Sequence, residues 1–171
     1  MRRVWAVLGS ALFLVIAPGV VVGLVPWWIS RWVIGPPLLG VPLVRALGVL
    51  LIALGIPVVL ESFARFALQG EGTPAPVFPT RRLVVKGFYR YVRNPIYLAN
   101  VSVIFGQGLL FGNVRLLAYG LLVWLGSHVF VVAHEEPTLR RTFGGEYDAF
   151  CANVPRWLPR LTPWSEPTAH G

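Results

Sequence analysis

Charged residues are scarce in this chain of 171 residues. Asp, Glu, Lys and Arg together make up 13% of it, against roughly 25% in soluble domains. Hydrophobic residues make up 56%, and the mean hydropathy is +0.67. A soluble fold of this length cannot bury so many apolar side chains, so the excess must face lipid. We therefore expect one compact membrane domain without a separate soluble one.

Cysteine and histidine are also scarce. The single cysteine, Cys151, excludes an internal disulfide and any metal site built on paired cysteines. His128 and His134 are too few and too badly placed to predict a metal centre. The net charge of +8 follows from membrane topology and attraction to anionic headgroups, because no basic patch stands apart from the predicted membrane face. The expected partner is a lipid bilayer and not nucleic acid, and the sequence leaves the oligomeric state open.

Long apolar runs predict about four transmembrane helices, since one crossing takes about 20 residues. The runs cover residues 4–28, 38–60, about 96–111 and 116–133. The first is interpreted as a span and not as a secretory signal, because it exceeds the roughly 7 to 15 apolar residues of a signal core and lacks a small-residue cleavage site. Pro57 should kink the second span, and Glu61 should end it. The short link at residues 112–115 makes the last two spans a helical hairpin.

Basic residues gather on one side of these predicted spans. The connector 62–95 and the C-terminal segment hold most of them, whereas the two opposite loops hold little beyond Arg31 and Arg115. By the positive-inside rule, both termini and the connector are cytoplasmic. The predicted protein is therefore an all-α polytopic membrane protein.

An amphipathic pattern follows Glu135. Apolar side chains recur there at intervals of three or four, at Leu139, Phe143, Tyr147 and Phe150. This spacing predicts an interfacial helix that lies on the membrane surface. We expect a single domain over residues 1–161 and a disordered tail over residues 162–171.

The first of two polar clusters precedes the third predicted span. Asn94 is a favoured N-cap and Pro95 a favoured first helical residue, so the span should begin there. Its positive end favours an anionic group such as a carboxylate. Hydroxyls and guanidinium groups flank that end, on Tyr89, Arg90, Tyr91, Arg93 and Tyr97. The alternative is a well-capped span with interfacial tyrosines and snorkelling arginines.

The second cluster follows the fourth predicted span. Glu135 and Glu136, next to His134, are adjacent carboxylates at a membrane boundary and suggest a cationic partner, an ammonium or a sulfonium. The alternative is a local ion pair between Glu136 and Arg140, which contributes about 0.3 to 0.5 kcal/mol. Within the third span stands the run Gly106, Gln107 and Gly108. Small residues there indicate close helix packing, and they also allow a flat ligand to lie against the backbone.

Residues 83–161 contain four short segments in this order: GFYRYVRNPIYLAN, the paired glutamates, TLRRTFGGEYDAF and VPRWLP. Together they resemble the C-terminal half of the isoprenylcysteine carboxyl methyltransferase and phospholipid methyltransferase superfamily. These are integral membrane enzymes that use S-adenosylmethionine. The first two predicted spans match only in general character. The resemblance implies S-adenosylmethionine as cofactor and a lipophilic methyl acceptor.

The resemblance also implies roles for particular residues. The family's Arg-His-Pro-variable-Tyr motif, its Gly-variable-Gly element and its paired glutamates assign cofactor binding to Arg93, Asn94, Pro95, Tyr97, Gly106, Gln107, Gly108, Glu135 and Glu136. Tyr89 and His134, which flank these motifs, are further candidates for cofactor binding. Catalytic roles fall to Arg93, Glu135 and Glu136. Asn94 stands where the family usually has histidine and cannot titrate, so a cofactor contact is expected there and not proton transfer. Asn153 stands where the prenylcysteine enzymes tend to have arginine, which disfavours a prenylcysteine carboxylate as substrate.

The expected function is methyl transfer from S-adenosylmethionine to a lipophilic small molecule or lipid at the cytoplasmic face, of the inner membrane if the protein is bacterial. Such transfer is an in-line displacement that mainly requires near-attack geometry. A carboxylate acceptor is already nucleophilic, whereas an amine must lose a proton and a thiol or phenol must ionise. Two alternatives remain. One is an NADPH-dependent membrane enzyme like the sterol reductases, and the other is a non-catalytic membrane protein with a degenerate site.

Overall fold

The computed structural model describes residues 16, 18–69, 83 and 85–165. Every regular element in these ranges is a helix, which confirms the predicted all-α class. The elements are η1 (Gly19–Leu24), α2 (Val25–Ser30), η2 (Leu38–Gly40), α3 (Leu43–Gln69), η3 (Gly87–Arg90), α4 (Pro95–Phe111), α5 (Val114–Phe130), η4 (Val131–Glu135), α6 (Glu136–Phe143) and α7 (Gly145–Asn153). Most of the first predicted span, residues 4–15 and 17, lies outside the described residues.

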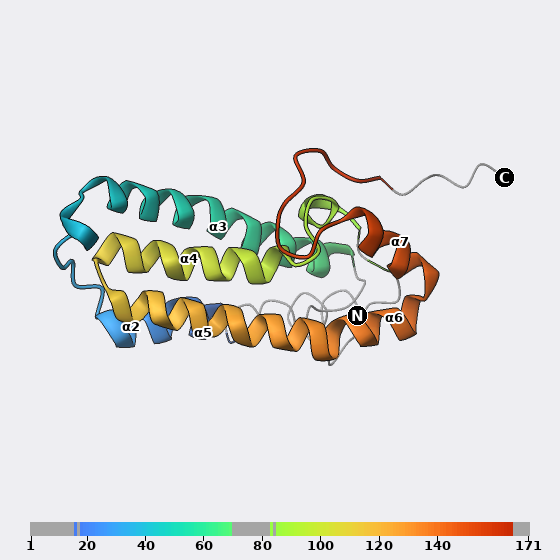
Figure 1. Cartoon of the computed structure of the whole chain (residues 1–171), viewed down its shortest axis with the longest axis horizontal. Helices are drawn as coiled ribbons and strands as arrows, with labels where there is room; N and C mark the ends of the chain where they lie inside the picture. The colour runs from blue at the N-terminus through green and yellow to red at the C-terminus, as the bar shows by residue number, and fades with distance from the viewer. Residues whose placement is uncertain (1–15, 17, 70–82, 84, 166–171) are drawn as a thin grey trace.

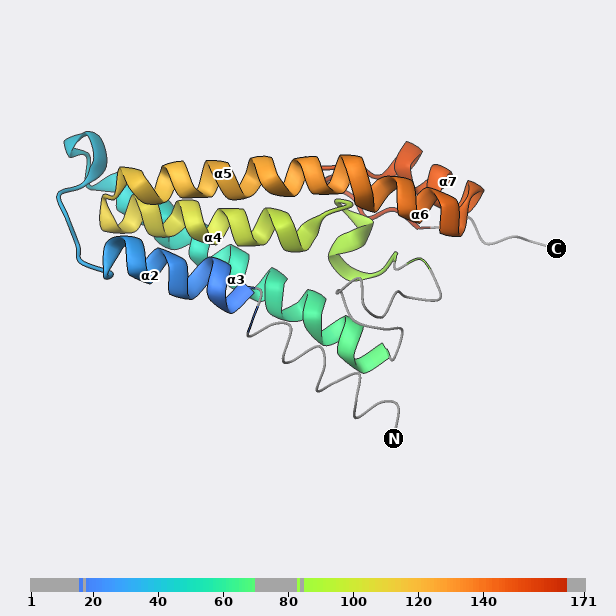
Figure 2. The same ribbon diagram turned by 90° about the horizontal axis from the view of Figure 1, so that it is seen from below.

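The long helices run side by side, with α4 between α3 and α5 and with α2 alongside (Figures 1 and 2). Leu43–Ser62 and Val114–Phe143 are long and apolar enough to cross a membrane, and Gly19–Ser30 and Pro95–Phe111 are shorter apolar helices. Large apolar side chains point outward from α3 and α5; Leu54 is 60% exposed and Leu122 is 67% exposed. Such exposed apolar faces are what a lipid environment accommodates.

Glycines bring α3 and α4 into close contact. A Cβ on Gly106 would lie 2.7 Å from the backbone oxygen of Gly48, and a Cβ on Gly48 would lie 2.6 Å from that of Gly106. Neither position has room for a side chain. Two residues further along α4, a Cβ on Gly108 would lie 2.5 Å from the Leu117 side chain on α5. The helix-packing interpretation of these glycines is therefore confirmed.

Helix α3 begins later than the predicted second span and extends beyond the end of that span. The helix begins at Leu43, after a turn in which Leu39 has a left-handed φ of 57°. It contains Pro57 and continues past Glu61 to Gln69. The apolar span itself ends at Ser62, next to the predicted end at Glu61. The helix continues beyond the span, because glutamate is a good helix former and its charge does not interrupt backbone hydrogen bonding.

The hairpin of α4 and α5 has the predicted form. Gly112 ends α4 with a left-handed φ of 66°, and the Asn113 side chain caps α5 by accepting from the amides of Arg115 and Leu116. From there the chain stays helical through α5, η4 and α6 for 30 residues, Val114–Phe143. At 1.5 Å per residue this is about 45 Å, longer than the roughly 30 Å hydrocarbon core of a bilayer. The helix includes a π-helical segment, Val131–Glu135, a feature often found at functional sites.

The segment after η4 differs from the predicted interfacial helix. Gly144, with φ 54°, separates α6 from α7. The predicted apolar stripe packs inside the protein, where Tyr147 and Phe150 are 2% and 3% exposed and Leu139 and Phe143 pack against them. These side chains are not free to lie in lipid.

Part of the predicted disordered tail is packed. Trp164 is 9% exposed and belongs to the same apolar cluster as Tyr147 and Phe150. The Arg90 guanidinium donates to the Trp164 carbonyl at 2.7 Å and to the Ser165 hydroxyl at 2.6 Å. Residues 162–165 are thus ordered by these contacts, and residues 166–171 lie outside the described part of the chain.

Candidate functional site

The two polar clusters of the sequence meet where α4 begins and η4 ends. The Tyr97 hydroxyl donates to Glu135 Oε2 at 3.0 Å, across 38 residues of sequence. Arg93 Nη1 donates to Glu136 Oε1 at 3.1 Å, across 43 residues. The antiparallel hairpin of α4 and α5 returns the chain to the same end of the bundle (Figure 1), which produces this meeting. The predicted convergence of both clusters is therefore present.

The two adjacent glutamates have different surroundings. Glu136 is 7% exposed, and Arg156 holds both of its carboxylate oxygens, with Nε 2.6 Å from Oε1 and Nη2 2.9 Å from Oε2. Such a bidentate arginine contact is among the strongest charge-assisted hydrogen bonds. With Arg93 as a second donor to Oε1, the oxygens of Glu136 are occupied by the protein itself.

The partner of Glu136 is not the one that helical spacing suggested. Arg140 instead pairs with Asp148 at 2.8 Å, in an exposed position. Sequence reasoning assigned Arg156 no role, because a contact across 20 residues of sequence follows from no local pattern. The available signal was its place in the VPRWLP piece.

Glu135 is half-buried and lies among tyrosines. Within the described residues, the ion pairs of this site go to Glu136 and none goes to Glu135. Burial, and then the nearby Glu135, Tyr97 and Glu61, raise the pKa of Tyr89 well above its usual range. Tyr89 therefore stays protonated and lies in the same group as Tyr97 and Glu135.

Asn94 begins α4 as predicted, but its side chain does not cap the helix. It occupies the N-cap position, Pro95 is the first helical residue, and the side chain makes no capping hydrogen bond. Instead its amide, in a residue 6% exposed, donates to the Arg156 carbonyl at 3.2 Å. The neighbouring Arg93 amide donates to the Pro155 carbonyl at 2.9 Å, so two adjacent residues before α4 bind two adjacent residues of the C-terminal segment. Asn94 thus fixes the segment that carries Arg156.

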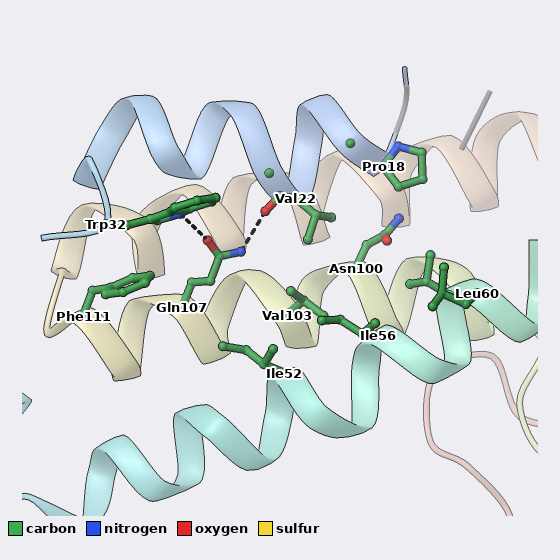
Figure 3. Close-up of a pocket in the computed structure, with 13 residues that line it drawn as sticks. Pro18, Val22, Trp32, Ile52, Ile56, Leu60, Asn100, Val103, Gln107 and Phe111 are labelled. Carbon is green, nitrogen blue, oxygen red and sulfur yellow. Dashed lines mark hydrogen bonds between the residues drawn. The ribbon is translucent and has the colours of Figure 1, made fainter. Parts of the chain in front are cut away.

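The run Gly106, Gln107 and Gly108 is not brought to this site. It begins eleven residues after Pro95, roughly 16 Å along α4. Gln107 bonds to η1 and to the turn after α2, donating to the Val22 carbonyl at 2.7 Å and accepting from the Trp32 indole at 3.2 Å (Figure 3). These bonds satisfy a polar side chain that lipid would otherwise penalise. The predicted grouping of this run with Arg93 and the glutamates is therefore not found.

His134 lies at the edge of the site. It is exposed on η4, and its ring is 5.2 Å from that of Phe130. Within the described residues no group of three or more His, Cys, Asp or Glu side chains is arranged to hold a metal ion.

The free groups of the site suit a zwitterionic ligand. Arg93 Nε is buried and has no hydrogen-bond partner among the described residues, so it offers a donor to an anion. The start of α4 adds a positive helix end. Glu135 offers a carboxylate that no described arginine neutralises. A carboxylate and an ammonium group on the same small molecule match this pair, as in the aminoacyl part of the cofactor that the sequence resemblance implies.

Comparison with known proteins supports the same conclusion. The sequence model of one family, described as Phospholipid methyltransferase, matches residues 43–146, more than half of the chain. The match extends from the start of α3 into α7 and includes Arg93, Tyr97, Glu135 and Glu136. No curated protein and no solved structure matches the chain.

Proposed function

The chain belongs to the phospholipid methyltransferase family of membrane enzymes, which use S-adenosylmethionine as methyl donor, and from this premise we propose that it methylates a lipophilic acceptor at the cytoplasmic membrane face. The observation that carries the proposal is the contact between the start of α4 and the end of η4. There an unpartnered arginine N–H and a carboxylate outside the described ion pairs occur in one small polar cluster.

Each residue of the cluster has a distinct part in the proposal. Arg93 Nε and the start of α4 bind the carboxylate of the cofactor's aminoacyl end. Glu135, steadied by the Tyr97 hydroxyl, binds its ammonium group. Glu136 holds the Arg93 guanidinium in place through a contact of 3.1 Å, and Arg156 in turn holds Glu136 at 2.6 Å. Glu136 is therefore a positioning residue.

The chemistry requires orientation more than acid or base groups. When bound, S-adenosylmethionine supplies an electrophilic methyl carbon, to which the acceptor's lone pair bonds while the electron pair of the broken C–S bond stays on sulfur. The protein holds the two reactants in line. An amine or hydroxyl acceptor releases its proton to water at the polar end of the bundle, since Glu136 is engaged by arginines and Glu135 by the ammonium group.

The orientation in the membrane follows from charge. Arg90 and Arg93 precede α4 and Arg156 contacts Glu136, whereas Arg31 follows α2 and Arg115 is in the first turn of α5. The end of α2 and the start of α5 lie at the other end of the bundle from the start of α4 (Figures 1 and 2). The positive-inside rule supports a cytoplasmic site, and the lengths of the apolar segments support about four spans. A lipophilic acceptor then enters sideways from the bilayer.

Ligand binding and methyl transfer test this function together. We expect S-adenosylhomocysteine to raise the unfolding temperature of detergent-purified protein and NADPH to leave it unchanged. Methyl-labelled S-adenosylmethionine should label a component of a membrane lipid extract, and the same headgroup without its chains should be methylated far more slowly. Stabilisation by NADPH would favour the reductase alternative, and stabilisation by neither ligand would favour a degenerate site.

A further inference from the structure

An open groove of about 570 Å³ lies between η1, α3 and α4 (Figure 3), and none of its described lining residues belongs to the polar cluster. Its walls are apolar, with Val22 from η1, Ile56 and Leu60 from α3, and Val103 from α4. No Asp, Glu, Lys, Arg or His is among its described lining residues. The volume is in the range of sites for small ligands, and the walls suit hydrocarbon.

Asn100 and Gln107 are the amide side chains in this groove, and they differ in how they are satisfied. Gln107 is bonded at both ends, to Val22 and Trp32. The Asn100 Oδ1 atom is buried and has no hydrogen-bond partner among the described residues. Figure 3 shows this side chain extending from α4 toward the helix that carries Pro18. A buried carbonyl oxygen without a partner is unfavourable unless a ligand supplies a donor.

The groove adjoins the proposed site of methyl transfer. Asn100 follows Tyr97 by three residues, about 4.5 Å along α4. On α3, Leu60 of the groove wall precedes Glu61, which lies close enough to Tyr89 to influence its pKa. From Asn100 the groove continues along α4 to Phe111, roughly 16 Å further into the predicted membrane.

We propose that this groove holds the hydrocarbon chain of the methyl acceptor, and that Asn100 Oδ1 accepts a hydrogen bond from an amine or hydroxyl of its head. The inference rests on the proposed function and names where its acceptor binds. A chain lying along α4 places its polar end at Asn100, beside Tyr97 and Glu135. The groove does not suit the cofactor's zwitterionic end, because the charged partners for that end are at Arg93 and Glu135.

Two variants test separately the binding of the acceptor's hydrocarbon chain and the binding of its polar head. Gly23 lines the groove, and a Cβ there meets no atom within 4 Å, so Gly23→Phe fills the groove without a clash at its base. Asn100→Leu removes the amide at similar volume. Gly126 on α5 is also free of neighbours within 4 Å and is outside the groove, so Gly126→Phe is the matched control.

The direct test uses a phosphatidylethanolamine that carries a photoreactive diazirine on one acyl chain, with S-adenosylhomocysteine binding measured in parallel. We expect cross-links on the groove faces of α3 and α4 in the wild type and in Gly126→Phe, and their loss in Gly23→Phe. Transfer of labelled methyl groups from S-adenosylmethionine to a lipid extract should fall about tenfold or more in Asn100→Leu and Gly23→Phe, as for a lost binding contact. The affinity of both variants for S-adenosylhomocysteine should stay unchanged.

Other results would overturn the inference. Cross-links of equal yield in wild type and Gly23→Phe would mean that bulk lipid is labelled. Loss of S-adenosylhomocysteine affinity in the two groove variants would assign the groove to the cofactor. Full methylation by both variants would show that the acceptor binds elsewhere. If instead the wild type binds no S-adenosylhomocysteine, the proposed function fails, and cross-linking still reports separately on the groove.

Discussion

Replacing Glu136 by Gln should destabilise the protein, although the change removes only a charge. Arg93 and Arg156 both point at this carboxylate, and their side chains are 12% and 32% exposed. Removing one partner of a buried ion pair typically costs about 3–5 kcal/mol, because the remaining charge is left without compensation. Since Arg156 is partly solvated, we expect the lower end, about 3 kcal/mol. For a chain of this size that corresponds to a fall in unfolding temperature of roughly 6–12 °C.

Replacing Glu135 by Gln should instead leave the stability nearly unchanged and weaken cofactor binding. The amide oxygen of Gln can still accept from the Tyr97 hydroxyl, so stability should change by no more than about 0.5 kcal/mol. Cofactor affinity should fall about tenfold, or 1.4 kcal/mol, because a charge-assisted contact to the ammonium group is lost. Glu146→Gln, at an exposed position on α7, is the control for removing one negative charge.

The assay is thermal unfolding in one detergent, with and without S-adenosylhomocysteine, followed by calorimetric titration below the lowest unfolding temperature. A Glu136→Gln protein as stable as the wild type but unable to bind ligand would refute the division of roles between the two glutamates. Both Glu135 and Glu136 would then be assigned to cofactor binding, as the sequence resemblance implies. A loss of stability in Glu135→Gln would count equally against the division.

Further predictions concern packing. Asn94→Asp should lower the free energy of unfolding by about 1–3 kcal/mol in denaturant titrations, because it removes the donor to the Arg156 carbonyl and places a carboxylate against it; a neutral effect would mean that this bond contributes nothing. Gly106→Ala should destabilise by about 1–3 kcal/mol through overpacking against α3, whereas Gly126→Ala, with open space around it, should not. Trp164→Ala should lower the stability by about 3–5 kcal/mol through loss of its packing, and an unchanged unfolding temperature would show that the predicted disordered tail was correct.

Local signals in the sequence were sufficient for part of this structure. The start of α4 at Asn94 and Pro95 and the hairpin with α5 follow from residues next to each other in sequence. The meeting of Tyr97 with Glu135 follows from the antiparallel return of α5. These features depend on helix start preferences and on segment lengths, which a single sequence carries.

The partners of buried polar groups could not be predicted in the same way. The bond from Asn94 to the Arg156 carbonyl spans 62 residues, and that from Gln107 to the Val22 carbonyl spans 85. No periodicity connects such positions, because they are set by how the helices pack. The apolar stripe of α6 and α7 was recognised, but lipid and Trp164 are equally good apolar partners for it on sequence grounds.

The attachment of residues 155–164 to residues 90–93 has a consequence for the order in which the protein matures. The amides of Arg93, Arg160 and Trp164 donate to the carbonyls of Pro155, Tyr91 and Arg90, each at 2.9 Å. Contacts so distant in sequence form late, since the intervening chain must first be closed into a loop. During synthesis the α4 and α5 hairpin can therefore enter the membrane while its polar end is still incomplete. Arg156 reaches Glu136 only when this segment has been made and folded back, so the polar cluster is complete only at the end of the protein's own biogenesis.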